Sequence, residues 1–111
     1  MSEVRKANNH FEIIADDGNV AGRMDFLDKA NERIIYHTEI SEEYGGQGLA
    51  GAIARGGLEA TKDEGQSVVA VCPFVRGWLE KHPSDVEEMG VEWRKPRPAD
   101  LQWLDEELKE Q

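Results

Sequence analysis

Tyr44-Gly45-Gly46-Gln47-Gly48-Leu49-Ala50-Gly51 is the stretch that decides the fold of this chain, because it holds four of the 11 glycines in the sequence. It lies between a strand-like run and a helix-like run. Glycine weakens regular secondary structure, so a cluster at such a junction indicates a backbone that approaches another group closely. The following helix begins with free N–H groups and the positive end of its dipole, which favour an anion. The stretch therefore predicts a ligand that carries phosphate.

Three strand-like runs precede the glycine stretch, over residues 10–16, 20–28 and 33–40. Turn-forming residues separate them at 17–19 and 29–32, and such short connections are typical of an antiparallel meander. Alternation with a period of two predicts the faces of the third run. One face would carry Ile35, His37 and Glu39, and the other Ile34, Tyr36, Thr38 and Ile40.

After the glycine stretch, apolar residues recur at helical spacing from Leu49 to Thr61, and Gly65 is placed to end this helix. The continuously apolar run 68–72 predicts a strand that is buried on both faces. A second helix is expected over 74–82, where prolines bound the run on both sides. Its buried side is expected to hold Phe74, Val75, Trp78 and Leu79.

The last part of the chain is expected to add a short strand at Val91 and Trp93 and a helix over 98–108. That helix carries a stripe of leucines, at Leu101, Leu104 and Leu108. The order of elements is then β-β-β-α-β-α with a C-terminal extension. This order predicts an α+β fold with a mostly antiparallel sheet and not a repeated βαβ fold.

Composition disfavours several classes of function. The net charge of −10 argues against a nucleic-acid partner, because such binding relies on Lys and Arg that neutralise phosphates. No apolar run approaches the roughly 20 residues of a membrane-spanning helix, and no signal-peptide core follows the N-terminus, so no membrane partner is expected. The single cysteine rules out an internal disulfide and favours a cytoplasmic protein. The three histidines lack the spacing of a metal site, so no metal is expected.

Two other phosphate-binding motifs fit the glycine stretch less well. Residues 46–51 match G-x-G-x-x-G, the dinucleotide fingerprint, but that fingerprint follows the first strand of a βαβ unit and needs an acid ending the next strand. Here three strand-like runs come first, and the next strand ends at Cys72. A P-loop needs Lys-Ser or Lys-Thr after the glycines, which this stretch lacks. A glycine-rich turn without a ligand is the remaining alternative.

Gly45-Gly46-Gln47-Gly48-Leu49-Ala50 resembles the coenzyme A pyrophosphate loop of the GNAT superfamily of N-acetyltransferases, written Q/R-x-x-G-x-G/A. Gly48 and Ala50 match this pattern, whereas Gly45 stands where Gln or Arg is usual. Two further runs are similar to segments of a small single-domain subfamily, the YjdJ-like group. They are His37-Thr38-Glu39-Ile40-Ser41-Glu42-Glu43-Tyr44, similar to HTEV-x-x-x-Y, and Cys72-Pro73-Phe74-Val75 with His82-Pro83, similar to CPFV…HP.

The resemblance covers residues 10–86, so that 1–9 would form an N-terminal arm and 87–111 an extension packing on the same domain. It implies a GNAT-like fold with two to three helices and a splayed pair of strands, the strand ending at Ile40 and the strand 68–72. The pantetheine arm of acetyl-CoA would lie in that opening, with the pyrophosphate on the glycine loop. The implied cofactor contacts are Thr38, Glu39, Ile40, Gly45, Gly46, Gln47, Gly48, Leu49, Ala50, Cys72, Phe74 and Arg76.

His37 and Cys72 are the catalytic residues that the resemblance implies, flanking the acetyl group. A neutral imidazole at His37 is suited to take the amine proton. Cys72 is suited to protonate the departing thiolate, or to accept the acetyl group itself. Alternatively, His37 is a structural histidine beside Glu39, and Cys72 is a small core residue. Many GNAT enzymes use a tyrosine on the helix after the splayed strand, where this chain has Phe74 and Trp78.

The expected function is N-acetyl transfer from acetyl-CoA to an amine of a small molecule or peptide, by direct transfer and not through an acetyl-cysteine. The alternative is a non-catalytic acyl-CoA-binding or protein-interaction module, which the missing tyrosine favours. The acidic net charge slightly favours a cationic acceptor. The sequence leaves the acceptor and the oligomeric state open.

Overall fold

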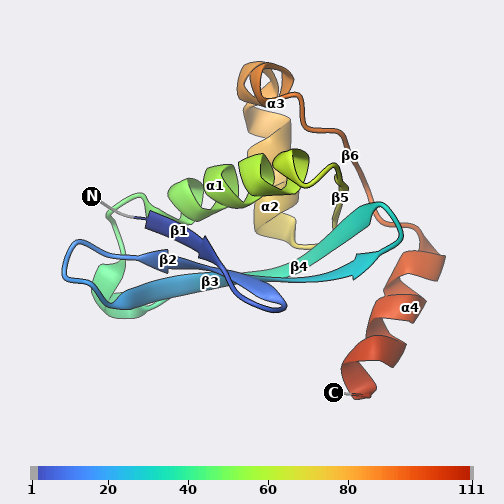
Figure 1. Cartoon of the computed structure of the whole chain (residues 1–111), viewed down its shortest axis with the longest axis horizontal. Helices are drawn as coiled ribbons and strands as arrows, with labels where there is room; N and C mark the ends of the chain where they lie inside the picture. Colours follow the sequence, from blue (N-terminus) through green and yellow to red (C-terminus); the bar gives the residue numbers. More distant parts are fainter. Residues whose placement is uncertain (1–2, 111) are drawn as a thin grey trace.

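The computed structural model describes residues 3–110, and within this range one sheet holds the strands in chain order, β1-β2-β3-β4-β5-β6 (Figure 1). β1 to β4 form an antiparallel meander. β5 then pairs in parallel with β4, and β6 pairs in parallel with β5. The predicted meander and the α+β class are confirmed. The strands are β1 (Glu3–Lys6), β2 (His10–Ile14), β3 (Val20–Lys29), β4 (Glu32–Ile40), β5 (Ser67–Ala70) and β6 (Trp93–Arg94).

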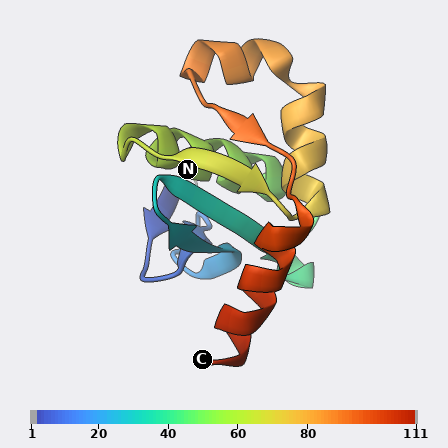
Figure 2. The ribbon, with the colours of Figure 1, turned by 90° about the vertical axis from the view of Figure 1, so that its right-hand side faces the viewer.

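Helices cover the two faces of the sheet unequally. The 3-10 helix η1 (Glu42–Tyr44) and α1 (Leu49–Asp63) follow β4, and α2 (Pro73–Lys81) and α3 (Pro83–Met89) follow β5. α1 and α2 lie on one face of the sheet, whereas α4 (Pro98–Lys109) lies on the other (Figures 1 and 2). None of the helices within residues 3–110 is long and apolar enough to cross a membrane.

The main core lies between the sheet and α1. The predicted helical spacing is confirmed, because Ile53 and Leu58 are fully buried on the side of α1 that meets the sheet. Gly57 lies on the same side, so close to Met24 of β3 that a Cβ atom there would clash with the methionine side chain. Glycine at this position therefore lets α1 approach the sheet closely.

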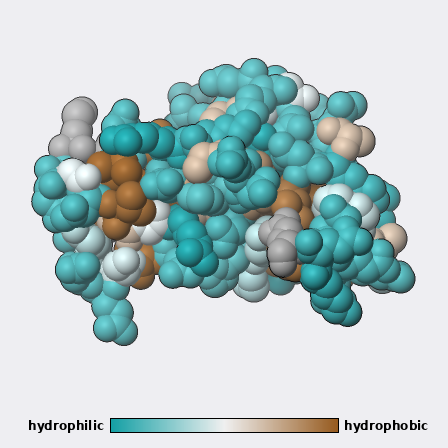
Figure 3. All heavy atoms as spheres, turned by 60° about the horizontal axis from the view of Figure 1, so that its bottom comes forward, coloured by the Kyte–Doolittle hydropathy of each residue, from teal (hydrophilic) through white to brown (hydrophobic). Residues whose placement is uncertain are grey.

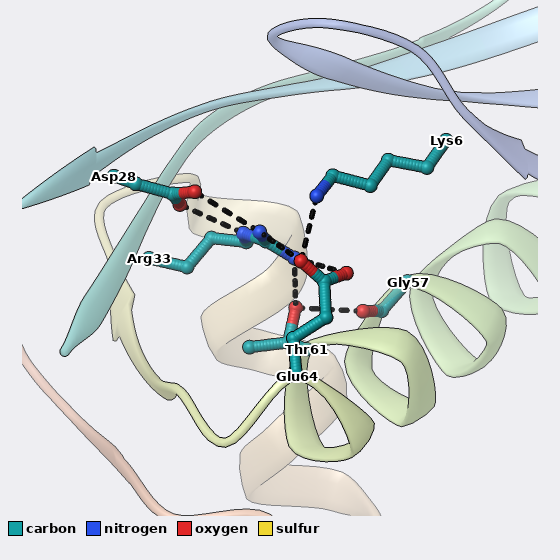
Figure 4. Close-up of polar contacts among 6 residues, drawn as sticks. All are labelled: Lys6, Asp28, Arg33, Gly57, Thr61 and Glu64. Carbon is teal, nitrogen blue, oxygen red and sulfur yellow. Dashed lines mark hydrogen bonds and ion pairs between the residues drawn. The ribbon is translucent and has the colours of Figure 1, made fainter.

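A buried arginine joins the C-terminal end of α1 to the β3–β4 hairpin (Figure 4). The Arg33 side chain is 0% exposed and donates to both carboxylate oxygens of Asp28 (2.8 and 3.0 Å) and of Glu64 (2.9 and 3.2 Å). Its guanidinium carbon also lies 4.2 Å from the ring centroid of Phe26. Lys6 of β1 donates to the same Glu64 (2.6 Å). These partners satisfy a charge whose burial would otherwise be strongly unfavourable.

α4 packs on the opposite face of the sheet through only part of its surface. Leu104 is buried (6% exposed) against Leu27 of β3, whereas Leu101 is 46% exposed. Of the predicted leucine stripe, only Leu104 is buried; Leu108 is exposed as well, and Trp103 packs beside Leu104. Seen from the side of α4, the surface is mostly hydrophilic, with small separate hydrophobic patches (Figure 3).

Residues 3–6, which the sequence places in an N-terminal arm, form the edge strand β1. This strand pairs with β2 from Glu3 opposite Ile14 to Lys6 opposite Phe11. Three of its four residues are charged, so the segment lacks the apolar pattern that predicts a strand from sequence. Charged residues are nevertheless typical of edge strands. The N-terminal segment therefore extends the sheet.

An ion-pair cluster joins the C-terminal extension to the sheet. β6 pairs in parallel with β5, which confirms the expected short strand near residue 93. Arg94 of β6 donates to both carboxylate oxygens of Glu32 in β4 (2.7 and 3.0 Å) and of Asp100 in α4 (2.7 and 3.0 Å). The backbone N–H of Arg97 donates to Asp100 as well (2.7 Å). The cluster fixes the start of α4 beside the first residue of β4.

Candidate acetyl-CoA site

An opening between β4 and β5 is the first part of the candidate site. The two strands pair as far as Ile35 opposite Ala70 and then separate. At this point the N–H groups of Val71 and Cys72 both donate to the Ile35 carbonyl (3.1 and 2.9 Å). Within the described residues, the remainder of β4 pairs with β3 alone, while the chain after β5 turns into α2. The predicted splayed pair is confirmed, and residues 37–40 present a free backbone edge.

A β-bulge at Tyr36 changes which β4 side chains face the opening. In the register with β3, Ile35 lies opposite Phe26 and His37 lies opposite Asp25, so that Tyr36 is an extra residue. An extra residue of this kind shifts the alternation of all side chains beyond it. The bulge falls one residue after the point where β4 and β5 separate.

Tyr36 lies on the face of Ile34, as predicted, but the predicted alternation of β4 is wrong from His37 onward. Thr38 lies opposite the core residue Met24 and so shares the α1 face of the sheet with Ile35. His37 lies on the opposite face, on the side where Tyr36 packs against the cluster under α4. A pattern with a period of two gives no sign of one extra residue, which explains the error.

Cys72 and Thr38 meet at the opening. Cys72 is the N-cap residue of α2, two positions beyond the end of β5, and is 3% exposed. Its Sγ lies 3.5 Å from the Thr38 hydroxyl oxygen, a distance that suits a weak hydrogen bond donated by the thiol. The sequence predicts a strand that ends at Cys72, but β5 ends at Ala70 because the backbone of Val71 and Cys72 turns toward Ile35.

His37 is held by a carboxylate on its own strand. Its Nε2 lies 2.9 Å from Oε1 of Glu39, and the His37 side chain is 49% exposed. The hydrogen bond from His37 lowers the pKa of Glu39, and the nearby Arg23 guanidinium at 3.4 Å adds to this effect. Among the described residues, no hydrogen bond joins His37 to Cys72. The two residues implied as catalytic thus stand at the same opening but on different faces of β4.

The glycine loop forms the N-terminal entrance to α1. Gly46 and Gly48 adopt left-handed backbone conformations (φ 78° and 73°), which L side chains rarely adopt. Gly48 is the N-cap residue of α1 and has no side chain to cap the helix, so the first N–H groups remain available to an anion. Gln47 is exposed in the same loop, while Leu49 is buried in the core and can offer only its backbone.

A hydrogen bond ties the loop to a distant turn. The Tyr44 hydroxyl, at the end of η1, donates to Oδ2 of Asp17 in the β2–β3 turn (2.6 Å). The other oxygen of Asp17 accepts from the backbone N–H of Asn19 (2.9 Å). The bond from Tyr44 lowers the pKa of Asp17, and the carboxylate raises the pKa of Tyr44. The sequence gives no sign of this contact, because the two residues lie 27 positions apart.

An open cavity of about 300 Å³ lies along α2, beside the first turn of α1. Its lining includes Phe74, Trp78 and Lys81. The prediction that Phe74 is buried is wrong, because this side chain is exposed along the cavity. A Cβ atom added to Gly51 in α1 would lie 3.8 Å from the Trp78 indole nitrogen, so Trp78, which lines the cavity, lies beside the first turn of α1. Arg76 lies on the same helix but does not line the cavity.

The end of α2 carries a stacked pair of rings. Trp78 and His82 stack with 4.4 Å between ring centroids, and Nδ1 of His82 lies 2.8 Å from the Trp78 carbonyl oxygen. The His82 ring thus interacts with a carbonyl in the last turn of α2. Within residues 3–110, no cluster of three or more His, Cys, Asp or Glu side chains is arranged to bind a metal ion.

The family model described as GCN5-related N-acetyl-transferase matches residues 10–89. The chain belongs to this family. Membership supports acetyltransferase activity, and the matched range contains the splayed strands, the glycine loop and the cavity on α2. β1, β6 and α4 lie outside it. No curated protein matches the chain.

Two solved structures are similar to this chain. A GCN5-like candidate N-acetyltransferase from Staphylococcus aureus is 26% identical, with a TM-score of 0.62, over 86% of this chain and 91% of that one. The ribosomal-protein-S18-alanine N-acetyltransferase of Escherichia coli is 13% identical, with a TM-score of 0.53, over 68% of this chain and 53% of that one. The second similarity concerns the fold alone, and the first agrees with the family.

Proposed function

We propose that this protein is a cytoplasmic N-acetyltransferase that moves the acetyl group of acetyl-CoA directly to an amine. The observation that carries the proposal is the free edge of β4 at residues 37–40, which adjoins an uncapped helix N-terminus behind the glycine loop. The edge suits the amide groups of a pantetheine arm, and the helix N-terminus suits a pyrophosphate. Acetyl-CoA carries both of these groups.

The described residues fit acetyl-CoA along its whole length. The backbone from Gly45 to Ala50 would bind the pyrophosphate, and the edge formed by Thr38, Glu39 and Ile40 would pair with pantetheine. The cavity on α2 would take the adenosine end, with Phe74 as its exposed aromatic contact. The lining of the cavity favours Lys81 over Arg76 as the cation for the 3′-phosphate.

Bound acetyl-CoA would supply an activated acetyl thioester at the opening. As the carbon–nitrogen bond to the amine forms and the carbon–sulfur bond breaks, one proton leaves the amine and one reaches the departing sulfur. His37 is half-exposed and fixed by Glu39, so it can accept the amine proton directly or through water. Cys72, whose thiol already points toward Thr38, can give a proton to the departing sulfur. Direct transfer needs no acetyl-cysteine.

A non-catalytic acyl-CoA-binding module is the second candidate. One observation favours it: His37 and Cys72 lie on different faces of β4 and are not hydrogen-bonded to each other. The test is release of free CoA from acetyl-CoA, measured with a polyamine, a lysine peptide and a peptide with a free N-terminus. Release that depends on an added amine supports the transferase. Tight binding without release, for every amine, supports the module.

The cofactor is tested by titration calorimetry with acetyl-CoA and NAD, using two glycine variants. Gly48→Val and Gly65→Val place the same residue at nearly the same left-handed φ (73° and 74°), at opposite ends of α1. Each should lose roughly 1–3 kcal/mol of stability through backbone strain. Only Gly48→Val should also weaken acetyl-CoA binding, by about tenfold or more. Preference of the wild type for NAD, or equal binding by both variants, would contradict the proposal.

A further inference from the structure

The glycine loop has few contacts of its own that could hold it in one conformation. Gly46 and Gly48 lie in open space, with no atom within 4 Å of where a Cβ would stand, and the loop from 45 to 48 is exposed. Glycine also has the largest conformational freedom to lose on ordering. The position of the loop must therefore be fixed at its two ends.

The C-terminal end of the loop is fixed by packing, because Leu49 and Ile53 of α1 are buried in the main core. The N-terminal end depends on η1. There the N–H of Ser41 donates to the carbonyl of Ala21 in β3 (2.8 Å), and the side chain of Tyr44 packs partly against the core. Tyr44 immediately precedes the loop, so its hydroxyl is the last side-chain anchor before the glycines.

The acceptor of this anchor is itself rigid. Asp17 lies in a tight turn in which the N–H of Gly18 donates to the Ala15 carbonyl and the N–H of Ala15 donates to the Asn19 carbonyl (2.9 Å each). One Asp17 oxygen accepts from the backbone of Asn19, which leaves the other aimed at Tyr44. A carboxylate fixed in this way accepts a short, charge-assisted bond of 2.6 Å.

We infer that Tyr44 and Asp17 are positioning residues that pre-organise the glycine loop for the pyrophosphate of acetyl-CoA. The inference rests on the proposed function for the identity of the ligand. Neither residue needs to touch the ligand. Their bond removes conformations of the loop in the free protein, so that less ordering remains to be done when the anion binds.

The test compares Tyr44→Phe, Asp17→Ser and the double variant with the wild type. Serine at 17 can still accept from the Asn19 backbone, as turn-forming serines do, but is too short to reach Tyr44. The dissociation constant for acetyl-CoA should rise roughly fivefold to tenfold in each single variant, and no further in the double variant. Amide hydrogen exchange at Gly45, whose N–H donates to the Glu42 carbonyl (3.0 Å), should become faster in the free variants, while the melting temperature changes by less than about 4 °C.

Two further variants separate the tether from its charge. Asp17→Asn removes the charge but keeps an oxygen for Asn19 and a polar amide for Tyr44, so it should bind acetyl-CoA more nearly like the wild type than Asp17→Ser does. Glu43→Gln removes a charge from η1 and should leave binding unchanged. Loss of affinity in Glu43→Gln equal to that in Asp17→Ser would overturn the inference in favour of a charge effect.

The outcomes distinguish the inference from the function on which it rests. A wild type that fails to bind acetyl-CoA contradicts the proposed function, and the hydrogen-exchange comparison then still tests the tether. Unchanged exchange at Gly45 in Tyr44→Phe overturns the tether. Faster exchange combined with unchanged acetyl-CoA affinity overturns its role in binding.

Discussion

Two carboxylates carry much of the dependence of stability on pH. The hydrogen bonds from Arg33 lower the pKa of Glu64 from 4.5 to about 2, and those from Arg94 lower the pKa of Asp100 from 3.8 to about 2. In each case the folded protein favours the charged form. The stabilisation is therefore fully present above the ordinary pKa and is lost as the pH falls through about 2.

The midpoint of urea unfolding should accordingly be level near pH 6 and fall between about pH 4.5 and pH 2. Asp100→Asn should be less stable than the wild type at pH 7, because the amide cannot form the same ion pair with Arg94. The difference should shrink as Asp100 of the wild type becomes protonated. Urea titrations of both proteins at pH 7, 4 and 2 measure it, and a difference that stays constant would contradict the assignment.

At the scale of single residues, the sequence predicts the site where the chemistry is local. The glycine loop before α1 and the turn at Cys72-Pro73 follow from residue types that act locally, since glycine permits the left-handed conformations seen at Gly46 and Gly48 and proline fixes φ. The bulge at Tyr36 does not follow from residue type, because it depends on how β4 pairs with β3. The bond from Tyr44 to Asp17 is hidden for a similar reason, since it joins segments that only the fold brings together.

At the scale of elements, helix periodicity predicts α1 well because one face of α1 is buried along its length. Periodicity also predicts α4, but it does not show how much of the helix is buried: α4 packs on the sheet around Leu104 and leaves the ends of its apolar stripe in solvent. A stripe in the sequence shows which face is apolar. How much of that face finds a partner depends on the angle at which the helix meets the sheet.

Leu104→Ala and Leu101→Ala provide a matched pair of substitutions on α4. Leu104→Ala should lower the free energy of unfolding by about 2–5 kcal/mol, because it opens a cavity against Leu27 and Val69. Leu101→Ala should change it by about 0.5 kcal/mol or less, since that side chain is already largely in water. Urea denaturation followed by circular dichroism measures both. Equal losses would mean that α4 buries a wider face than described here.

At the scale of the whole molecule, the cluster around Arg33 connects parts of the chain that are distant in sequence. Asp28 is five residues away on the same hairpin, but Glu64 is 31 residues away at the end of α1. Lys6 of β1 joins the cluster through Glu64. The whole cluster is assembled only when the hairpin, α1 and the edge strand are all in place (Figure 4).

This placement has a consequence for the kinetics of unfolding. A contact that needs three docked segments should form after the folding transition state, so its loss should act mainly on the unfolding rate. Arg33→Ala should lower stability by about 3 kcal/mol, which corresponds to roughly a hundredfold faster unfolding with little change in the folding rate. Stopped-flow chevron plots measure both rates, with Arg55→Ala, an exposed ion-pair residue, as the control. Slower folding in Arg33→Ala would mean that the Arg33 contacts form before the folding transition state. If the folding rate is unchanged, Arg33 prolongs the lifetime of the native state but contributes little to the rate at which the chain folds.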